Sequence, residues 1–510
     1  MKVSEKTTAL KPLPKTIILN NPPKKSKIRQ NIPIGTSFTV TTILDNDTKE
    51  DDLFLLEIMQ LDKELKNKYN SIMHVNNDLN RKMVSFQANK KKPFYRWYKY
   101  KEGFSAELVD YYINKRGLKN THMLLDPFAG SGTALFSAEN LGVNSLGIEL
   151  LPIGQHLINS RKILSNFTKK DFERLIKWRN TKPWVTHKEM ADFTVLRITK
   201  DAYPSSNETA IKQFLSCVND ERENVKSVLM LALFCALENI SYTRKDGQYL
   251  RWDQRSGRCQ SSKPFNKGII PDFKDALTEK LDEIISDIQP FKNKLSTPEA
   301  NSTVQIIGGS CLKELPLVKA NSIDIVITSP PYCNRYDYTR TYALELAILG
   351  IDESGIIALR QEMLSCTVEN REKDLLSLNP SWAMPITICD KQVLLQKIIE
   401  YLNFLKTHKK INNNGIPRMV TGYFYEMACV IFELYRVLSP GGEVIMINDN
   451  VRYCGASISV DLILSDIASQ LGFKIEEISV LPINKGNSSQ QMGSRGKEPL
   501  RKCVYIWRKP

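Results

Sequence analysis

The chain has 510 residues, of which 42% are hydrophobic and 25% are charged, and its formal net charge is +15. This length predicts more than one domain. The charge favours a polyanionic partner, most simply nucleic acid, unless the whole proteome is lysine-rich. No apolar run reaches the length of a membrane span, the ten cysteines lie apart, and only five histidines occur. We therefore expect no membrane segment, no metal site and a reducing, cytoplasmic environment.

The first 90 residues are predicted to form an irregular, basic arm and then one amphipathic helix, because apolar residues recur at helical spacing between 51 and 69. Basic and aromatic residues alternate over 90–101. This pattern serves either contact with phosphates and bases or packing of the rings on the core. A further helix is predicted after Phe104, with Ser105 as its N-cap.

The segment 123–133 combines a short apolar strand, an acid and a glycine-rich turn that leads into a helix. Its acid, turn and helix-start residues are Asp126, Pro127, Phe128, Gly130, Gly132 and Thr133. Glycines let the backbone approach a ligand closely, and the amides at the start of a helix suit an anionic group. A second strand, 145–149, ends at Glu149, where an acid commonly bonds ribose hydroxyls. Leu135 replaces the third glycine of the dinucleotide motif, so an adenosyl ligand with an amino-acid tail fits better.

Two polar, mostly helical inserts are predicted, at 166–300 and 351–420. The first contains an apolar helix at 225–240 and then a basic-aromatic hairpin that turns at 246–247. Its basic residues Arg244, Lys245 and Arg251 either enter a DNA groove or belong to a charged surface loop. The remaining strands are predicted at 304–310, 323–328, 443–447, 474–481 and 503–507, with the last two antiparallel, and the remaining helices at 427–438 and 460–471.

The strand at 323–328 ends at a proline pair, in the order Ser329, Pro330, Pro331 and Tyr332. Proline donates no backbone hydrogen bond and holds the residue before it extended, so the turn is rigid. In open α/β sheets, ligands bind beyond the carboxyl ends of the strands. Ser329 and Tyr332 are therefore expected to face a pocket, although a purely structural turn is the alternative.

In this order, the motifs resemble those of the amino-methylating DNA methyltransferases, which use S-adenosylmethionine. Residues 126–133 are similar to the glycine-rich cofactor motif and 329–332 to the catalytic tetrapeptide, while Phe104, Ser105 and Glu149 resemble further cofactor positions. The resemblance implies an α/β, Rossmann-like methyltransferase fold, with a mostly parallel seven-stranded sheet, an antiparallel last strand and a largely helical inserted target-recognition region. Gly309 departs from the family by replacing an acid that often contacts adenine, so either Ser310 or the backbone is the expected substitute.

The implied domain boundaries follow the motifs. The catalytic domain comprises 91–165, 301–350 and 421–510, after the arm and helix at 1–90. Residues 166–300 form the inserted target-recognition region, because the two motifs lie about 195 residues apart where a plain sheet needs about 60. The second insert, 351–420, shares that task or packs against it.

The implied reaction is methyl transfer to an exocyclic amino group of a base in duplex DNA. Such a group is a poor nucleophile because its lone pair is conjugated with the ring. The Ser329 hydroxyl and the Pro330 carbonyl would accept the amino hydrogens and turn the lone pair toward the methyl donor, while Tyr332 stacks on the flipped base. A leading serine favours N4 of cytosine, with N6 of adenine as the alternative. Carbon-5 methylation is excluded, because it needs a Pro-Cys thiolate and the chain has no such pair.

Two other classes of protein are weaker alternatives. An RNA amino-methyltransferase usually begins its tetrapeptide with Asp and carries a separate N-terminal RNA-binding domain. An inactive DNA-binding subunit would not need the intact motif residues. The resemblance also implies a bacterial, nucleoid-associated enzyme with a cognate restriction endonuclease as its functional partner.

Overall fold

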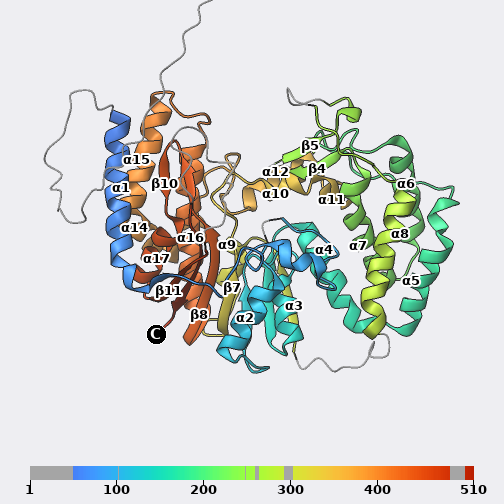
Figure 1. Cartoon of the computed structure of the whole chain (residues 1–510), viewed down its shortest axis with the longest axis horizontal. Coiled ribbons are helices and arrows are strands. Elements are labelled where there is room, and N and C mark those ends of the chain that lie inside the picture. The colour runs from blue at the N-terminus through green and yellow to red at the C-terminus, as the bar shows by residue number, and fades with distance from the viewer. Residues whose placement is uncertain (1–49, 102, 247–248, 259–263, 292–301, 483–499) are drawn as a thin grey trace, which may run out of the picture. The chain divides into compact units, whose positions relative to one another are not determined.

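The computed structural model describes residues 50–101, 103–246, 249–258, 264–291, 302–482 and 500–510 (Figure 1). Its centre is an eight-stranded sheet in the order β1-β11-β12-β8-β7-β2-β3-β6. The strands are β1 Met73–Val75, β2 Met123–Asp126, β3 Asn144–Glu149, β6 Val304–Gly308, β7 Ile323–Thr328, β8 Leu438–Asp449, β11 Lys474–Val480 and β12 Lys502–Arg508. The predicted basic arm lies almost entirely outside the described residues.

Neighbouring strands of this sheet are parallel, except that β12 is antiparallel to both β8 and β11. The expectation of a mostly parallel α/β sheet is therefore confirmed. The predicted count of seven strands is too low, because β1 adds an edge strand beside β11 and its three residues are too few to show a pattern. Strand β8 also begins before the predicted position. A register shift between Ile323 and Ile325 of β7 accommodates its extra residues.

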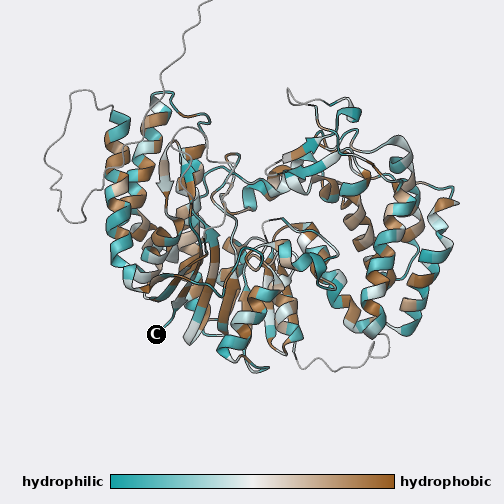
Figure 2. Ribbon diagram, viewed as in Figure 1, coloured by the Kyte–Doolittle hydropathy of each residue, from teal (hydrophilic) through white to brown (hydrophobic). Residues whose placement is uncertain are grey.

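The two faces of the sheet bury alternate residues of each strand, as the two-residue repeat of a strand requires. Val326 of β7 joins one core, whereas Ile325 and Ile327 join another. Figure 2 shows the strands as largely hydrophobic and the helices as hydrophobic mainly on one side. The first core includes α1 Glu50–Lys68, α14 Ala383–Lys391, α15 Val393–Thr407, α16 Ile416–Val437 and α17 Val460–Gln470, and the second includes α2 Ala106–Arg116 and α3 Thr133–Asn140.

Between β3 and β6 the chain leaves the sheet and forms a helical insert with a core of its own. Its elements are α4 Pro152–Lys162, α5 Lys169–Thr181, α6 Ser205–Asn219, α7 Glu223–Ile240, the hairpin β4 Thr243–Asp246 and β5 Tyr249–Trp252, and α8 Phe273–Ile288. The apolar helix predicted at 225–240 is α7. Trp178 stacks on Trp184 at 5.9 Å, and Phe214 meets both rings edge-on, so aromatic packing holds α5 and α6 together. Gly247 of the predicted turn lies outside the described residues.

The chain between β7 and β8 is also mostly helical, but it is divided between two cores. Helices α10 Tyr338–Thr341, α11 Ala343–Ile348 and α12 Glu353–Glu362 contribute to the core of the insert, whereas α13 Leu375–Leu378 contributes to a core of the sheet, as do α14 and α15. The short helix α9 Cys311–Glu314 follows β6, and the hairpin β9 Val451–Tyr453 and β10 Ala456–Ile458 follows β8. Within the described ranges, no helix is long and apolar enough to cross a membrane.

Candidate active site

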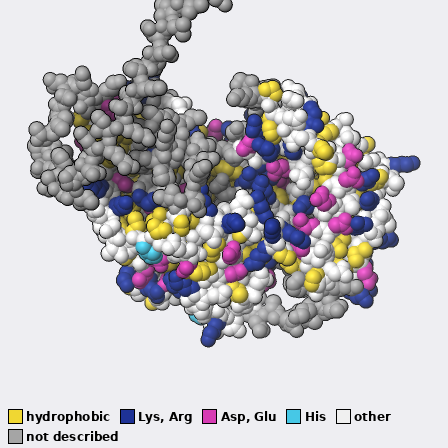
Figure 3. All heavy atoms as spheres, in the orientation of Figure 1, with side chains coloured by type: hydrophobic (Ala, Val, Ile, Leu, Met, Phe, Trp, Pro, Cys, Tyr) yellow, Lys and Arg dark blue, Asp and Glu magenta, His cyan; other side chains and the backbone are white. Residues whose placement is uncertain are grey.

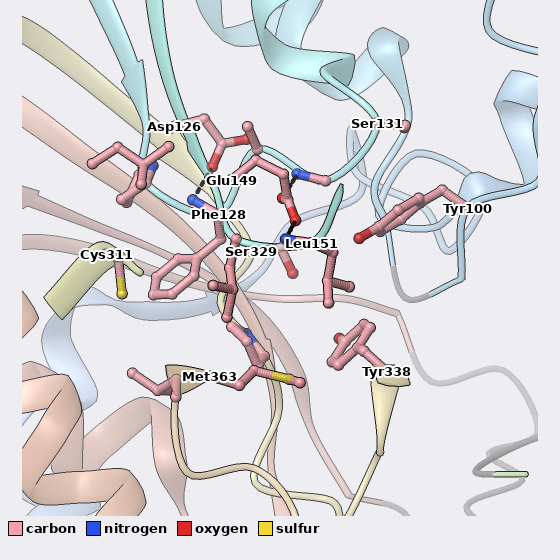
Figure 4. Close-up of a pocket in the computed structure, with 18 of the residues that line it drawn as sticks. Tyr100, Asp126, Phe128, Ser131, Glu149, Leu151, Cys311, Ser329, Tyr338 and Met363 are labelled. Atoms are coloured by element: carbon pink, nitrogen blue, oxygen red, sulfur yellow. Dashed lines mark hydrogen bonds between the residues drawn. The ribbon is translucent and has the colours of Figure 1, made fainter. Parts of the chain in front are cut away.

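A cavity of about 780 Å³ lies beyond the carboxyl ends of β2, β3, β6 and β7 (Figure 4). Its lining includes Gly130 from the glycine-rich turn and Ser329 from the proline turn, which are about 200 residues apart in the chain but share this space. Figure 4 shows Glu149, Phe128 and Ser329 around its middle, with Tyr100 and Tyr338 on one side. The other predicted site residues in the lining are Phe104, Asp126, Pro127, Thr133, Ser310 and Pro331.

Glu149 closes the end of β3 in this cavity. One carboxylate oxygen accepts the backbone amide hydrogen of Gly130 at 2.6 Å, and the other accepts that of Leu151 at 2.7 Å. Burial raises the pKa of the Glu149 carboxyl to about 8, although both amide bonds favour its ionised form. A side chain at Gly154 would come within 2.7 Å of this carboxylate, so Gly154 is required for its placement. The carboxylate is thus held by backbone on two sides before any ligand binds.

Asp126 fixes the relation between the two neighbouring strand ends. Its carboxylate accepts the Thr328 hydroxyl hydrogen at 2.6 Å and the Phe128 amide hydrogen at 3.1 Å. Burial raises its pKa to about 7. Because Thr328 immediately precedes Ser329, this side-chain bond ties the start of the proline turn to the start of the glycine-rich turn.

The two glycines of the turn have different roles. Both have a positive φ, +56° at Gly130 and +77° at Gly132, which disfavours other residues. A side chain at Gly130 would press on the ring of Tyr100 at the cavity wall. A side chain at Gly132 would instead lie 2.8 Å from Ile158, inside the core. Gly130 therefore lines the cavity, while Gly132 permits close packing behind it.

Two of the predicted cofactor residues point elsewhere. Ser105 is fully buried, and its hydroxyl donates to the Met83 carbonyl at 2.8 Å, so it anchors the chain before α2. Ser310 lines the cavity, but its hydroxyl donates to the Glu362 carbonyl at 2.8 Å. A side chain at Gly309 would collide with Glu314, which occupies the adjacent space. Neither hydroxyl is thus directed at the cavity.

The proline turn lies between this cavity and a second one. The Ser329 hydroxyl donates to the Tyr332 phenol oxygen at 3.1 Å. Tyr332 is 3% exposed and lines the second cavity, of about 630 Å³, which shares Tyr100 and Gly103 with the first. The ammonium group of Lys502 lies 5.1 Å from the centre of the Tyr332 ring. Pro330 is buried within the turn.

The basic hairpin separates its charges between surface and core. Arg244 and Arg251 are partly exposed, share Asp246 as ion-pair partner, and flank the ring of Phe265. Lys245 points the other way, because successive strand residues alternate. Its side chain is 3% exposed and pairs with Glu345, so Lys245 does not belong to a surface that DNA could reach. Figure 3 shows a band of Lys and Arg side chains across the middle of the face in view.

In the basic-aromatic segment 90–101, the rings pack on the core, which is one of the two predicted roles; its contact with phosphates and bases stays a prediction. Its rings at Tyr95, Trp97, Tyr98 and Tyr100 are buried, whereas the lysines at 90, 99 and 101 line the second cavity. Tyr100 belongs to this pattern and has the most central position of its aromatic residues. It stacks on Tyr342 at 5.0 Å and lines both cavities.

Other cavity residues carried no signal in the sequence. Tyr338, Met363 and Leu364 come from the chain between β7 and β8, where helical patterning gives no indication of a site. They close the cavity opposite the sheet, as Figure 4 shows for Tyr338 and Met363. Across the described part of the chain, no group of three His, Cys, Asp or Glu side chains could hold a metal ion.

Comparison with known proteins agrees with this geometry, although no family model matches the chain. The chain is 53% identical over 465 residues to the Type II methyltransferase M.AvaI of Nostoc sp., a match that covers 91% of this chain and 96% of the relative. The same identity and coverage relate it to M.AvaI of Anabaena variabilis. It is 40% identical over 472 residues to the Type II methyltransferase M.BsoBI of Geobacillus stearothermophilus, covering 88% and 92% of the two chains.

The mostly parallel sheet, with its glycine-rich turn and buried acid at neighbouring strand ends, has the architecture of an α/β methyltransferase. Within that class the extent of the similarity leaves one assignment. The chain belongs to the Type II methyltransferases.

Proposed function

We propose that this chain transfers a methyl group from S-adenosylmethionine to the exocyclic N4 amino group of cytosine in duplex DNA. It would serve as the modification enzyme of a restriction-modification system, with a cognate endonuclease as functional partner in the bacterial cytoplasm. One observation carries the proposal: the glycine-rich turn at Gly130 and the proline turn at Ser329 open onto a single cavity. A methyl donor and a methyl acceptor bound at the two turns would therefore meet.

The first cavity suits S-adenosylmethionine in its chemistry. Glu149 presents a carboxyl group held by two amides, whose ionised form ribose hydroxyls would favour, and Gly130 leaves the backbone open to close approach. Phe128, Leu151 and Ile148 supply apolar surface for adenine. When bound, this cofactor supplies an electrophilic methyl group.

The proline turn would activate the amino group by orientation alone. The Ser329 hydroxyl and the Pro330 carbonyl accept the two amino hydrogens, which turns the nitrogen lone pair out of conjugation with the ring. Tyr332 would stack on the base and hold its plane. The base must leave the helix to reach this site, because its amino group is inaccessible within a duplex. Catalysis then depends on positioning and electrostatics rather than on a strong base.

The choice of base rests on the first residue of the tetrapeptide. A leading serine, Ser329, resembles the cytosine-N4 enzymes, whereas Asp or Asn is usual in adenine-N6 enzymes. Methylation of N6 of adenine is therefore the second candidate. An RNA amino-methyltransferase and an inactive DNA-binding subunit have less support, because the relatives that match this chain over nearly their whole length are named Type II methyltransferases.

The region of the insert is proposed to recognise the target sequence. Arg244 and Arg251 carry exposed guanidinium groups on the hairpin, and the net charge of +15 supports a polyanionic partner. Lys245 is left out of this proposed contact set, since it pairs with Glu345 in the interior.

The experiment is methyl transfer with identification of the product. The purified chain is incubated with tritiated S-adenosylmethionine and either bacterial genomic DNA or tRNA, and the nucleosides are separated after digestion. We expect label in N4-methyldeoxycytidine with the wild type and about 100-fold less, or lower still, with the Ser329→Ala variant. Label in N6-methyldeoxyadenosine would select the adenine alternative. Label in tRNA alone, or in neither substrate, would overturn the proposal.

A further inference from the structure

The second cavity has a one-sided charge. Among the described residues that line it, every formally charged side chain is a lysine: Lys90, Lys99, Lys101 and Lys502. The polar remainder includes Ser85, Gln87 and Tyr332. A concave site with several cations and hydrogen-bond donors suits an anionic ligand.

The local fold brings these lysines together. The 3-10 helix Phe86–Lys91 carries Lys90. Further along, Lys99 and Lys101 flank Tyr100, whose ring is buried against Tyr342. The Lys101 backbone amide donates to the Tyr342 hydroxyl at 2.8 Å, which fixes this part of the segment.

Within the described residues, the cations of the segment 90–101 are not all paired with carboxylates. Lys92 pairs with Asp110 at 2.6 Å, and Arg96 pairs with Asp287. Lys90 and Lys99 are exposed, and neither forms an ion pair with a carboxylate in the described part of the chain. The segment therefore uses some cations to hold its own fold and presents others to the cavity.

We infer that the lysine-lined second cavity binds the phosphodiester that flanks the extruded nucleotide. This inference rests on the proposed function. Tyr332 and the lysines line the same cavity, so a base stacked on Tyr332 would keep its own sugar-phosphate within reach of Lys90 and Lys99. Extruding a base costs unstacking energy, and charge contacts to its phosphate offset part of that cost. Lys502 has a different role: it pairs with Asp449 at 2.9 Å and lies over the Tyr332 ring, which positions that ring.

The competing anion is the carboxylate of the amino-acid tail of S-adenosylmethionine. The two cavities share Tyr100 and Gly103, so this tail is the other anionic group that could enter. If the lysines bind the DNA phosphate, removing them should weaken the reaction with DNA. If they bind the carboxylate of S-adenosylmethionine, removing them should weaken the binding of that cofactor.

The test pairs a double variant with a neutralised phosphate. Lys90→Gln/Lys99→Gln is compared with Lys91→Gln/Lys119→Gln, which removes two exposed lysines outside either cavity lining. The substrate is a duplex containing a site that the wild-type enzyme methylates, with either natural phosphates or methylphosphonates on both sides of the target base. The readouts are kcat/KM for methyl transfer and calorimetric affinity for S-adenosylmethionine.

We expect the cavity variant to lose about tenfold or more in kcat/KM on the natural duplex. The kcat/KM of this variant should be no lower on the methylphosphonate duplex than on the natural duplex, because the variant lacks the lysines that would contact the phosphate charge. The control variant and the wild type should both lose activity on the methylphosphonate duplex, and affinity for S-adenosylmethionine should be unchanged in all.

Two results would overturn the inference. One is that methylphosphonates lower kcat/KM by the same factor in the cavity variant and in the control, so that the effects of the lysines and of the phosphates are additive. The other is a fall in affinity for S-adenosylmethionine in the cavity variant with unaltered phosphate sensitivity, which would assign the lysines to the cofactor tail. Failure of the wild type to methylate DNA would instead refute the proposed function itself.

Discussion

The carboxylate of Glu149 accepts the backbone amide hydrogen of Gly130 across 2.6 Å, joining the end of β3 to the glycine-rich turn after β2. This bond places a buried acid beside Gly130, where a side chain would press on the ring of Tyr100. The acid and the turn are thus positioned together. Several measurable properties depend on this arrangement.

The first prediction concerns proton release on cofactor binding. With a pKa of about 8, the Glu149 carboxyl is mostly protonated at pH 7 in the free protein. Ribose hydroxyls donate hydrogen bonds and favour the ionised form, so binding should release up to about one proton. Calorimetry in two buffers of different ionisation enthalpy measures this release. Glu149→Gln should bind S-adenosylmethionine more weakly and release correspondingly less, which also corrects for titration of the ligand. A wild-type binding enthalpy independent of buffer would contradict the assignment.

The second prediction concerns stability and pH. Burial raises the pKa of the Glu149 carboxyl from 4.5 to about 8, so the folded state favours the protonated form. This contribution to stability is fully present below pH 4.5, and it is lost as the pH rises through about 8. The melting temperature of Glu149→Gln without ligand should therefore fall less between pH 5 and 9 than that of the wild type. Equal pH profiles for the two proteins would argue against a protonated Glu149.

The third prediction separates the two polar members of the proline turn. Ser329→Ala should lower kcat by about 10²–10³, since it removes an acceptor aimed at the reacting amino group. Tyr332→Phe keeps the ring and loses one hydrogen bond with Ser329, so its loss should be about tenfold or less. Tyr332→Ala removes the stacking surface as well and should lose more. Single-turnover rates at saturating DNA check this order. A larger loss in Tyr332→Phe than in Ser329→Ala would contradict these roles.

The fourth prediction contrasts buried and exposed charges on the hairpin. Lys245→Met leaves the Glu345 carboxylate buried without its cation and should lower the free energy of unfolding by about 3–5 kcal/mol. Lys245→Met/Glu345→Leu should recover much of this loss. Arg244→Gln and Arg251→Gln should leave stability almost unchanged and each reduce the salt slope of DNA binding by about 0.9. Denaturant unfolding and fluorescence titration provide the two measurements. An unchanged salt slope would show that neither arginine contacts DNA.

The fifth prediction uses a matched pair of glycines. Both Gly132 and Gly117 have positive φ, but a side chain at Gly132 would meet Ile158 and Phe136, whereas Gly117 has open space around it. Gly132→Ala should lower the free energy of unfolding by about 2–4 kcal/mol, and Gly117→Ala by about 1–2 kcal/mol. Equal effects in denaturant unfolding would show that backbone strain alone matters at Gly132.

Local patterns made the sheet predictable. Strand β7 follows from an apolar, β-branched run that ends at turn residues, and β2, β3 and β12 from short runs that contain apolar residues; all four were located within one or two residues. The edge strand β1 was not predictable, because three half-exposed residues become a strand only through pairing with β11. The extra length of β8 likewise depends on the strand beside it.

Residues of the candidate site were predictable where the residue type itself limits the possible chemistry. They were not predictable where tertiary contacts decide the direction of the side chain. Gly130 and Glu149 line the cavity that their positions at strand ends predicted, while their roles toward a cofactor stay predictions. Side-chain direction was not available from the pattern. Lys245 and Ser105 had suitable types, but strand alternation turned the first inward and a carbonyl of Met83 engaged the second. Met363 entered the cavity from a distant segment whose sequence carries no motif.

Strands β3 and β6 are hydrogen-bonded neighbours, with Glu149 opposite Gly308, although more than 150 residues separate them. The two ends of the helical insert between them are therefore held together by the hydrogen bonds between these strands. The sequence of the insert can drift, lengthen or be exchanged in evolution while the strand ends that form the cleft keep their register. Changes within the insert, which we propose recognises the target sequence, can therefore leave the strand ends of the site in place.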